Sequence, residues 1–149
     1  MIGQATGAVS STGASLIIPH SLHALSDALL KVGMAERALV VSQQALEEID
    51  RNGQELFRAE HLRFKAEAAM RLGDRAAAMA DLQKALETAK AHAAAWVQLR
   101  CAIAFARAQR GSGEQNTARV MLIDARSRLQ EGFETPDFRE ATNLLQELA

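Results

Sequence analysis

Apolar residues recur along this chain at the three- and four-residue spacing of amphipathic α-helices. The clearest stripes are Leu62, Ala66, Ala69 and Gly73; Ala78, Leu82, Ala85, Leu86 and Ala89; and Ala118, Leu122, Ala125 and Leu129. Side chains three or four positions apart share one helix face, so each stripe predicts a helix with one buried side. Strand signals are sparse, because the two adjacent β-branched apolar pairs, Ile17-Ile18 and Val40-Val41, do not alternate with polar residues.

Start and stop signals divide the chain into seven predicted helices. Proline is tolerated in the first turn of a helix, so Pro19 marks the first start. Thr135-Pro136-Asp137 opens the last helix with a capping hydroxyl, a proline and an acid near the positive end of the helix dipole. The predicted helices cover residues 19–32, 34–51, 55–72, 74–91, 94–110, 115–131 and 136–148.

Glycines end these helices at regular intervals and reveal an internal repeat. Gly33, Gly73 and Gly111 are 40 and 38 residues apart, which is the length of two helices and two turns. In the first two copies an alanine follows the glycine after five residues, as Ala38 and Ala78. The third copy, residues 110–125, has two extra residues between Gly111 and its alanine. The repeat therefore predicts antiparallel helix pairs, with an irregular third copy.

Small residues at the helix crossings and a glycine between the helices resemble the tetratricopeptide repeat. Ala66, Ala69, Gly73, Ala78, Leu82 and Ala85 match the successive small and apolar positions of its pattern. The resemblance implies an all-α, TPR-like α-solenoid of three helix pairs and a C-terminal helix over residues 16–149. Residues 1–15 are small, uncharged and rich in glycine and serine, and we interpret them as a flexible lead-in.

A narrower resemblance covers nearly the whole chain. Segments 59–74, 99–111 and especially 131–148, which begins Glu-Gly-Phe-Glu-Thr-Pro-Asp, resemble the C-terminal repeat region of large bacterial signalling proteins. In that family the repeats follow an ATPase module and accompany a class III adenylate cyclase or a transcriptional regulator domain. The nucleotide-binding and cyclase residues of the family have no counterparts here. The resemblance therefore implies the scaffold region alone, as a short protein or as part of a longer one.

Composition narrows the range of functions. The chain has 17 basic and 18 acidic residues scattered along it, so no basic stripe indicates nucleic acid. Exposed acid–base pairs four residues apart are expected at Glu47–Arg51, Glu67–Arg71 and Asp124–Arg128. No apolar run approaches the roughly 18 residues needed to cross a bilayer. With no signal peptide pattern and a single cysteine, we expect a cytoplasmic protein without membrane or direct nucleic-acid contacts.

Motifs for catalysis or for nucleotide binding are missing, so we predict that the chain is not an enzyme and needs no cofactor. His20, His23 and Asp27 share one helix face, but without a fourth ligand they are read as polar surface and no metal site is predicted. Cys101 on an apolar helix is read as a packed hydrophobe rather than a reactive thiol. Phe133 is expected to pack under the last helix rather than to stand exposed as an anchor for a partner, and Trp96 is favoured as a core residue.

The first helix of each pair is expected to line a concave groove that binds a partner protein or peptide. The repeat register places the following residues in it: His20, His23, Asp27 and Lys31; Glu60, Arg63, Glu67, Met70 and Arg71; and Gln98, Cys101 and Phe105. The alternative for these positions is an ordinary solvated charged face. The alternative function is self-association or signal relay within a larger ATPase- or cyclase-type regulator, through apolar residues Leu16, Ile17 and Ile18.

Overall fold

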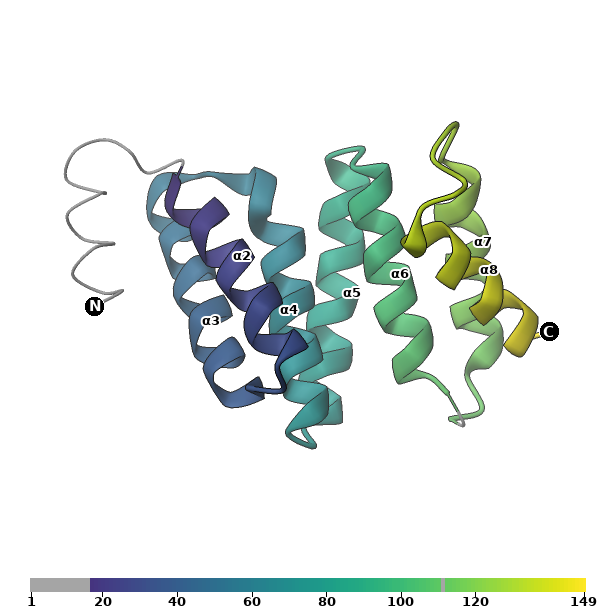
Figure 1. Ribbon diagram of the computed structural model, residues 1–149, viewed down its shortest axis with the longest axis horizontal. Helices are drawn as coiled ribbons and strands as arrows, with labels where there is room; N and C mark the ends of the chain where they lie inside the picture. The colour runs from purple at the N-terminus through teal and green to yellow at the C-terminus, as the bar shows by residue number, and fades with distance from the viewer. Residues whose placement is uncertain (1–16, 111) are drawn as a thin grey trace.

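Helices account for all regular secondary structure in the part of the chain that the computed structural model describes, residues 17–110 and 112–149, with side chains from residue 21 onward (Figure 1). The predicted all-α fold with seven α-helices is confirmed over these residues. The elements are α2 (Ile17–Lys31), α3 (Ala35–Asn52), the 3-10 helix η1 (Glu55–Phe57), α4 (Arg58–Arg71), α5 (Arg75–Ala91), α6 (Ala95–Ala108), α7 (Gln115–Ser127) and α8 (Pro136–Glu147). The predicted lead-in, residues 1–15, lies outside the described residues.

Two helix boundaries differ clearly from the prediction. The helix predicted from residue 55 begins at Arg58, because residues 55–57 form the tighter turn η1. The helix predicted to residue 131 ends at Ser127, because the N–H groups of Arg128 and Leu129 bond three residues back and tighten the last turn.

The start of α8 agrees with the prediction. The hydroxyl of Thr135 accepts a hydrogen bond from the Phe138 N–H at 3.3 Å, and Pro136 occupies the first helical position. Phe133 keeps 53% of its surface exposed, although its ring centroid lies 5.0 Å from that of Phe138. Trp96 is partly buried against the main core.

The turn glycines correct the spacing of the repeat. Gly33, Gly73 and Gly113 have φ of +81°, +87° and +84°, the left-handed conformation that favours glycine, and each stands two residues before the next helix. These three glycines are 40 residues apart in both intervals, so Gly113, rather than Gly111, is the equivalent position. The two extra residues inferred for the third copy therefore disappear. The alanines five residues after them, Ala38, Ala78 and Ala118, are all fully buried.

The turn between α5 and α6 closes without glycine. Ala93 adopts φ of +51° there, and the N–H of Ala94 bonds the carbonyl of Ala89 at 3.0 Å, the pattern seen at the glycine turns. At the first glycine turn the matching bond runs from Met34 to Leu29 at 2.8 Å. The break predicted near His92 is thus confirmed, and one alanine adopts a backbone conformation that side chains disfavour.

The helices pack in chain order from α2 to α8 (Figure 1). In addition, α2 contacts α4, α4 contacts α6, and α6 contacts α8. The intervening helices α3, α5 and α7 pack mainly on the helices that precede and follow them in the chain. The four helices α2, α4, α6 and α8 therefore form a continuous row along one side of the molecule.

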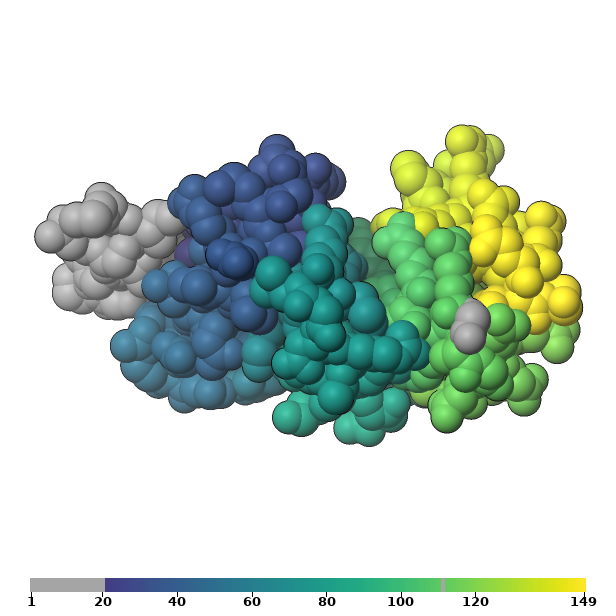
Figure 2. Space-filling view, turned by 90° about the horizontal axis from the view of Figure 1, so that it is seen from below, coloured from purple at the N-terminus to yellow at the C-terminus, as the bar shows by residue number. Residues whose placement is uncertain are grey.

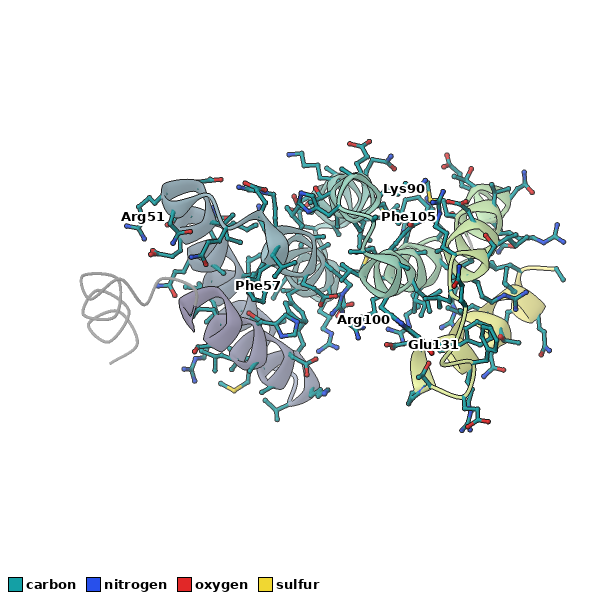
Figure 3. All side chains as sticks on the ribbon, turned by 90° about the horizontal axis from the view of Figure 1, so that it is seen from above. Arg51, Phe57, Lys90, Arg100, Phe105 and Glu131 are labelled. Carbon is teal, nitrogen blue, oxygen red and sulfur yellow. The ribbon has the colours of Figure 1, made fainter. Side chains whose placement is uncertain are left out.

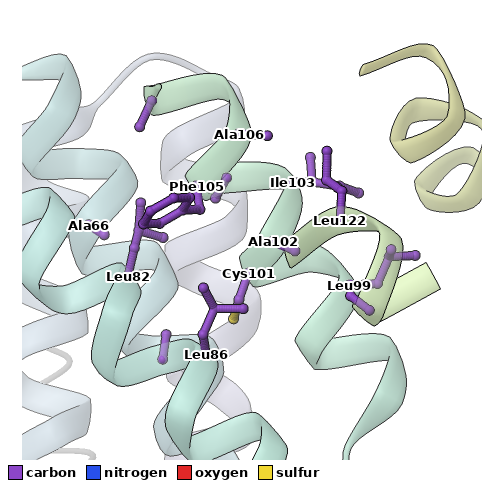
Figure 4. Packing of buried hydrophobic residues seen from close by; sticks show 14 of the residues in the cluster. Ala66, Leu82, Leu86, Leu99, Cys101, Ala102, Ile103, Phe105, Ala106 and Leu122 are labelled. Carbon is purple, nitrogen blue, oxygen red and sulfur yellow. The ribbon is translucent and has the colours of Figure 1, made fainter. Parts of the chain in front are cut away.

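Alanine dominates the interior between these helices. The larger core runs from α3 to α8 and includes Leu82, Leu99 and Leu122 (Figure 4). Phe64 belongs to a smaller core between α2, α3 and α4. Alanine has the highest helix propensity, and its short side chain lets neighbouring helices approach closely. Among the described helices, none combines the length and apolar character needed to span a membrane.

Candidate functional site

A cavity of about 550 Å³ opens between α2, α4, α6 and α8, and we call it the central cavity. Figure 2 shows the hollow between the N-terminal helices and the C-terminal segment, and Figure 3 shows Arg100 directed into it. Its lining consists of His23, Asp27, Leu30, Lys31, Glu60, Arg63, Phe64, Glu67, Arg71, Arg100, Ile103, Arg107, Asp137 and Glu140. Most of these side chains are ionisable, so the cavity is a polar site.

The 40-residue repeat explains which side chains of α2, α4 and α6 face the central cavity. His23, Arg63 and Ile103 are equivalent positions of the three helices and all line it. Asp27, Glu67 and Arg107 are a second equivalent set, one helical turn further on. Equivalent positions of the three helices thus face the same cavity but carry different side chains.

Glu60 is the centre of the hydrogen-bond network in this cavity. Its side chain is 6% exposed, and its carboxylate contacts His23 Nε2 at 3.2 Å, Arg63 Nη2 at 2.6 Å and Arg100 Nη1 at 3.3 Å. Burial opposes ionisation of Glu60, but the hydrogen bond with His23 and the charges of Arg63 and Arg100 together lower its pKa to about 2. Glu60 is therefore a fixed negative charge at neutral pH.

Arg63 is held at the floor of the central cavity. Its side chain is 12% exposed, its Nη1 donates to Glu67 Oε1 at 2.8 Å, and its guanidinium carbon lies 4.5 Å from the Phe64 ring centroid. Burial disfavours its charge, but Glu60 and Glu67 raise its pKa above the ordinary value. Arg63 Nε has no hydrogen-bond partner among the described residues.

Ion pairs also tie α8 to the rest of the row. Arg100 Nε donates to Asp137 Oδ2 at 3.0 Å, and Arg107 pairs with Glu140. At the other end, Lys31 Nζ lies 2.7 Å from Asp27 Oδ2 within α2. The lining holds five basic and five acidic side chains, so the formal charge of the central cavity is balanced with His23 neutral.

A second cavity of about 380 Å³ lies between α4, α5 and α6, and we call it the basic cavity. Its lining is Ala66, Glu67, Met70, Arg71, Arg75, Leu82, Ala104, Arg107, Ala108 and Arg110. Glu67, Arg71 and Arg107 line both cavities, so the two adjoin. Four arginines face a single carboxylate over an apolar floor, which distinguishes the basic cavity from its balanced neighbour.

Eight of the predicted groove residues reach these cavities. His23, Asp27, Lys31, Glu60, Arg63, Glu67 and Arg71 line the central cavity, and Met70 lines the basic cavity. The predicted pair Glu67–Arg71 is wrong, because Glu67 pairs with Arg63 and Arg71 donates to the Leu30 carbonyl. Arg51 likewise pairs with Glu48 rather than Glu47, whereas Asp124–Arg128 is confirmed at 3.3 Å.

Three predicted groove residues on α6 are wrong. Gln98, Cys101 and Phe105 are 2%, 0% and 5% exposed, and the latter two belong to the main core (Figure 4). The error came from using Gly111 as the turn glycine, which shifted the register of the third pair by two residues. Burial also raises the pKa of the Cys101 thiol to about 12, which disfavours the thiolate.

The sequence prediction missed Arg100, Ile103 and Arg107, which are the 40-residue equivalents of lining positions on α4. A signal was present, because Arg100 and Arg107 are the two charged residues of α6 and lie two helical turns apart. Asp137 and Glu140 were missed as well. They lie on α8, which follows the third pair.

No group of three metal-ligating side chains is arranged around a common point among those described, and the side chain of His20 lies outside them. The chain matches no protein-family model, no curated protein and no solved structure.

Proposed function

We propose that this chain is a protein–protein interaction scaffold whose central cavity binds an extended segment of a partner protein. The observation that carries the proposal is the row α2, α4, α6 and α8, which presents equivalent side chains of successive helices to one cavity. In a TPR-like α-solenoid such a row forms the concave face, and a segment crossing it meets one helix after another.

The charges in the cavity suit recognition of a polar segment. Carboxylates and guanidinium groups alternate across the row, and the two arginines of the Glu60 network, Arg63 and Arg100, are each held by two carboxylates. Side chains that are ordered before binding lose less conformational entropy when the partner arrives. The cavity therefore offers preorganised donors and acceptors to a peptide backbone.

The wider setting follows from the family resemblance. We propose that the scaffold serves a bacterial signalling or regulatory system, in the cytoplasm, as the repeat region of an ATPase- or cyclase-type regulator. Self-association is the alternative, and the residues first suggested for it, Leu16, Ile17 and Ile18, lie outside the described side chains. Light scattering over a wide concentration range separates the two, because a strict monomer contradicts self-association.

A steric block tests the binding site. Lys31 at the edge of the central cavity is 74% exposed, so Lys31→Cys provides a thiol for a bulky maleimide. The wild-type chain is a built-in check, because buried Cys101 is expected to stay unlabelled in the folded protein. Arg119→Cys on α7, which is exposed and lines neither cavity, is the matched control.

The binding partner in this test is a peptide selected from a random displayed library on the unmodified full chain. Label at position 31 should abolish binding of that peptide, and label at position 119 should leave it unchanged. A library that yields no binding peptide, or a peptide insensitive to both labels, contradicts the proposal.

A further inference from the structure

The basic cavity has a charge imbalance that its own residues do not resolve. Arg71, Arg75, Arg107 and Arg110 line it, with Glu67 as the single acid. Glu67 Oε1 is already engaged by Arg63 Nη1 at 2.8 Å. An anionic group entering this cavity would therefore meet a surplus of guanidinium donors.

Two of these arginines bind neutral oxygens. Arg71 donates to the carbonyl of Leu30, and Arg75 donates to the carbonyl of Ala108 and to Gln109 Oε1, the latter at 3.0 Å. Neither arginine pairs with a carboxylate anywhere in the described ranges. Each guanidinium has five N–H donors, so capping a helix carbonyl leaves others for a ligand.

The other two arginines are held by weak partners. Arg107 pairs with Glu140 and Arg110 pairs with Glu147, and the arginine side chains are 46% and 55% exposed. Ion pairs as exposed as these contribute about 0–1 kcal/mol. A ligand carboxylate can replace them at little cost.

The floor of the basic cavity adds a second requirement. Met70, Leu82, Ala66, Ala104 and Ala108 provide apolar surface beneath the arginines. A ligand that fills this space combines an acid with an adjacent apolar group. Nucleic acid fits poorly, because its bases call for aromatic stacking partners and this lining has none.

We infer that the basic cavity binds an acidic part of the partner segment, in which aspartate or glutamate stands beside an aliphatic side chain. The inference rests on the proposed function, because the segment reaches this cavity from the central one past Glu67, Arg71 and Arg107. Charge complementarity at this end then fixes the direction in which the segment lies across the helices.

To test this inference, peptides that bind the full chain are selected from the displayed random library. The affinity of one selected peptide, labelled with fluorescein, is then measured by fluorescence anisotropy. We expect enriched sequences in which acids adjoin leucine, isoleucine or methionine. Arg71→Gln combined with Arg110→Gln should weaken that peptide at least about tenfold, the loss expected from one charge-assisted hydrogen bond. Arg37→Gln combined with Arg119→Gln removes the same charge from α3 and α7 and should leave affinity within about twofold.

Other results overturn the inference. Enriched peptides without acids, or equal weakening by both double variants, would show that the basic cavity is not the recognition site while leaving the scaffold proposal standing. A single-stranded oligothymidine that competes as well as the peptide would overturn it too, and a library with no binders overturns both proposals. The double variant also loses the hydrogen bond from Arg71 to the Leu30 carbonyl, and circular dichroism shows whether it still folds. If it does not fold, Arg110→Gln alone must still weaken binding by about threefold.

Discussion

Arg100 and Asp137 join two helices that are separated by a full helix and a long turn. Arg100 Nε lies 3.0 Å from Asp137 Oδ2 in the first turn of α8, while Nη1 of the same guanidinium reaches Glu60 Oε1 on α4 at 3.3 Å. Neighbouring carboxylates raise the pKa of Arg100 despite the cost of its burial. One side chain of α6 thus connects the helices on both of its sides.

The Arg100–Asp137 pair should show a measurable but modest coupling. Both side chains are more than one third exposed, so solvent screens the attraction, and we expect a coupling free energy of about 0.5 kcal/mol. Urea unfolding of Arg100→Ala, Asp137→Ala and the double variant measures it as a double-mutant cycle. Strictly additive effects would mean that the two side chains do not interact in solution.

Glu60 should make stability depend on pH. Its pKa is about 2 in the folded chain against an ordinary 4.5, so ionised Glu60 stabilises the fold fully above the ordinary value. That contribution is lost as the pH falls through the interval toward 2. Wild type should therefore exceed Glu60→Gln in unfolding free energy at about pH 6, and the difference should shrink at about pH 3.

Urea unfolding at the two pH values checks this prediction for Glu60. Exposed Glu131, changed to glutamine, is the control and should show no such trend. A gap between wild type and Glu60→Gln that stays constant with pH would contradict the network as described.

Gly132 should tolerate no side chain, for a reason beyond its φ of +76°. A Cβ atom there would lie 2.6 Å from Cζ2 of Trp96, whereas one on Gly113, with φ of +84°, would meet nothing within 4 Å. Both alanine variants incur the left-handed cost of about 1 kcal/mol, and Gly132→Ala adds overpacking of about 1–3 kcal/mol. Chemical unfolding measures the difference.

Fluorescence gives an independent readout for Gly132, because Trp96 is the single tryptophan of the chain. Native-state emission should change in Gly132→Ala and stay as in wild type for Gly113→Ala. Equal stability losses together with equal spectra would contradict the contact between Gly132 and Trp96.

Ala93→Gly should stabilise the protein. Ala93 has φ of +51°, where a Cβ atom is disfavoured and glycine is not, so we expect a gain of about 0.5–1 kcal/mol. Ala80→Gly, at an exposed position inside α5, is the control with the opposite expected sign. Its free energy of unfolding should fall by about 1 kcal/mol. Thermal melts of the two variants should move in opposite directions, and a matching decrease in both would refute the prediction.

The sequence predicted the all-α class and most of the first two helix pairs because apolar spacing and turn glycines are local signals. Gly33 and Gly73 set the register that correctly placed Glu60, Arg63 and Glu67. The third pair was predicted wrongly because two glycines, Gly111 and Gly113, offer themselves as the turn glycine in the sequence, and only Gly113 keeps the 40-residue spacing. A two-residue shift rotates a helix by about 200°, which exchanged the core face for the cavity face.

The contribution of α8 was missed, although Glu140 stands 40 residues after Arg100 and 80 residues after Glu60, and all three line the central cavity. The helix was predicted from its cap, but the face that it turns toward α6 was not, because the 38-residue interval to Gly111 concealed the 40-residue register. That orientation depends on long-range pairing with Arg100 and Arg107. The basic cavity was missed for a related reason, because Arg75 and Arg110 come from different elements and meet only after packing.

The Glu60 carboxylate accepts hydrogen bonds from α2, α4 and α6 at once. Any bending of the molecule along its length must change the distances from this one group to His23 and Arg100 in concert. Moving α2 or α6 away from α4 would leave a buried anion short of hydrogen-bond donors, so the network resists any change in how these three helices lie beside one another.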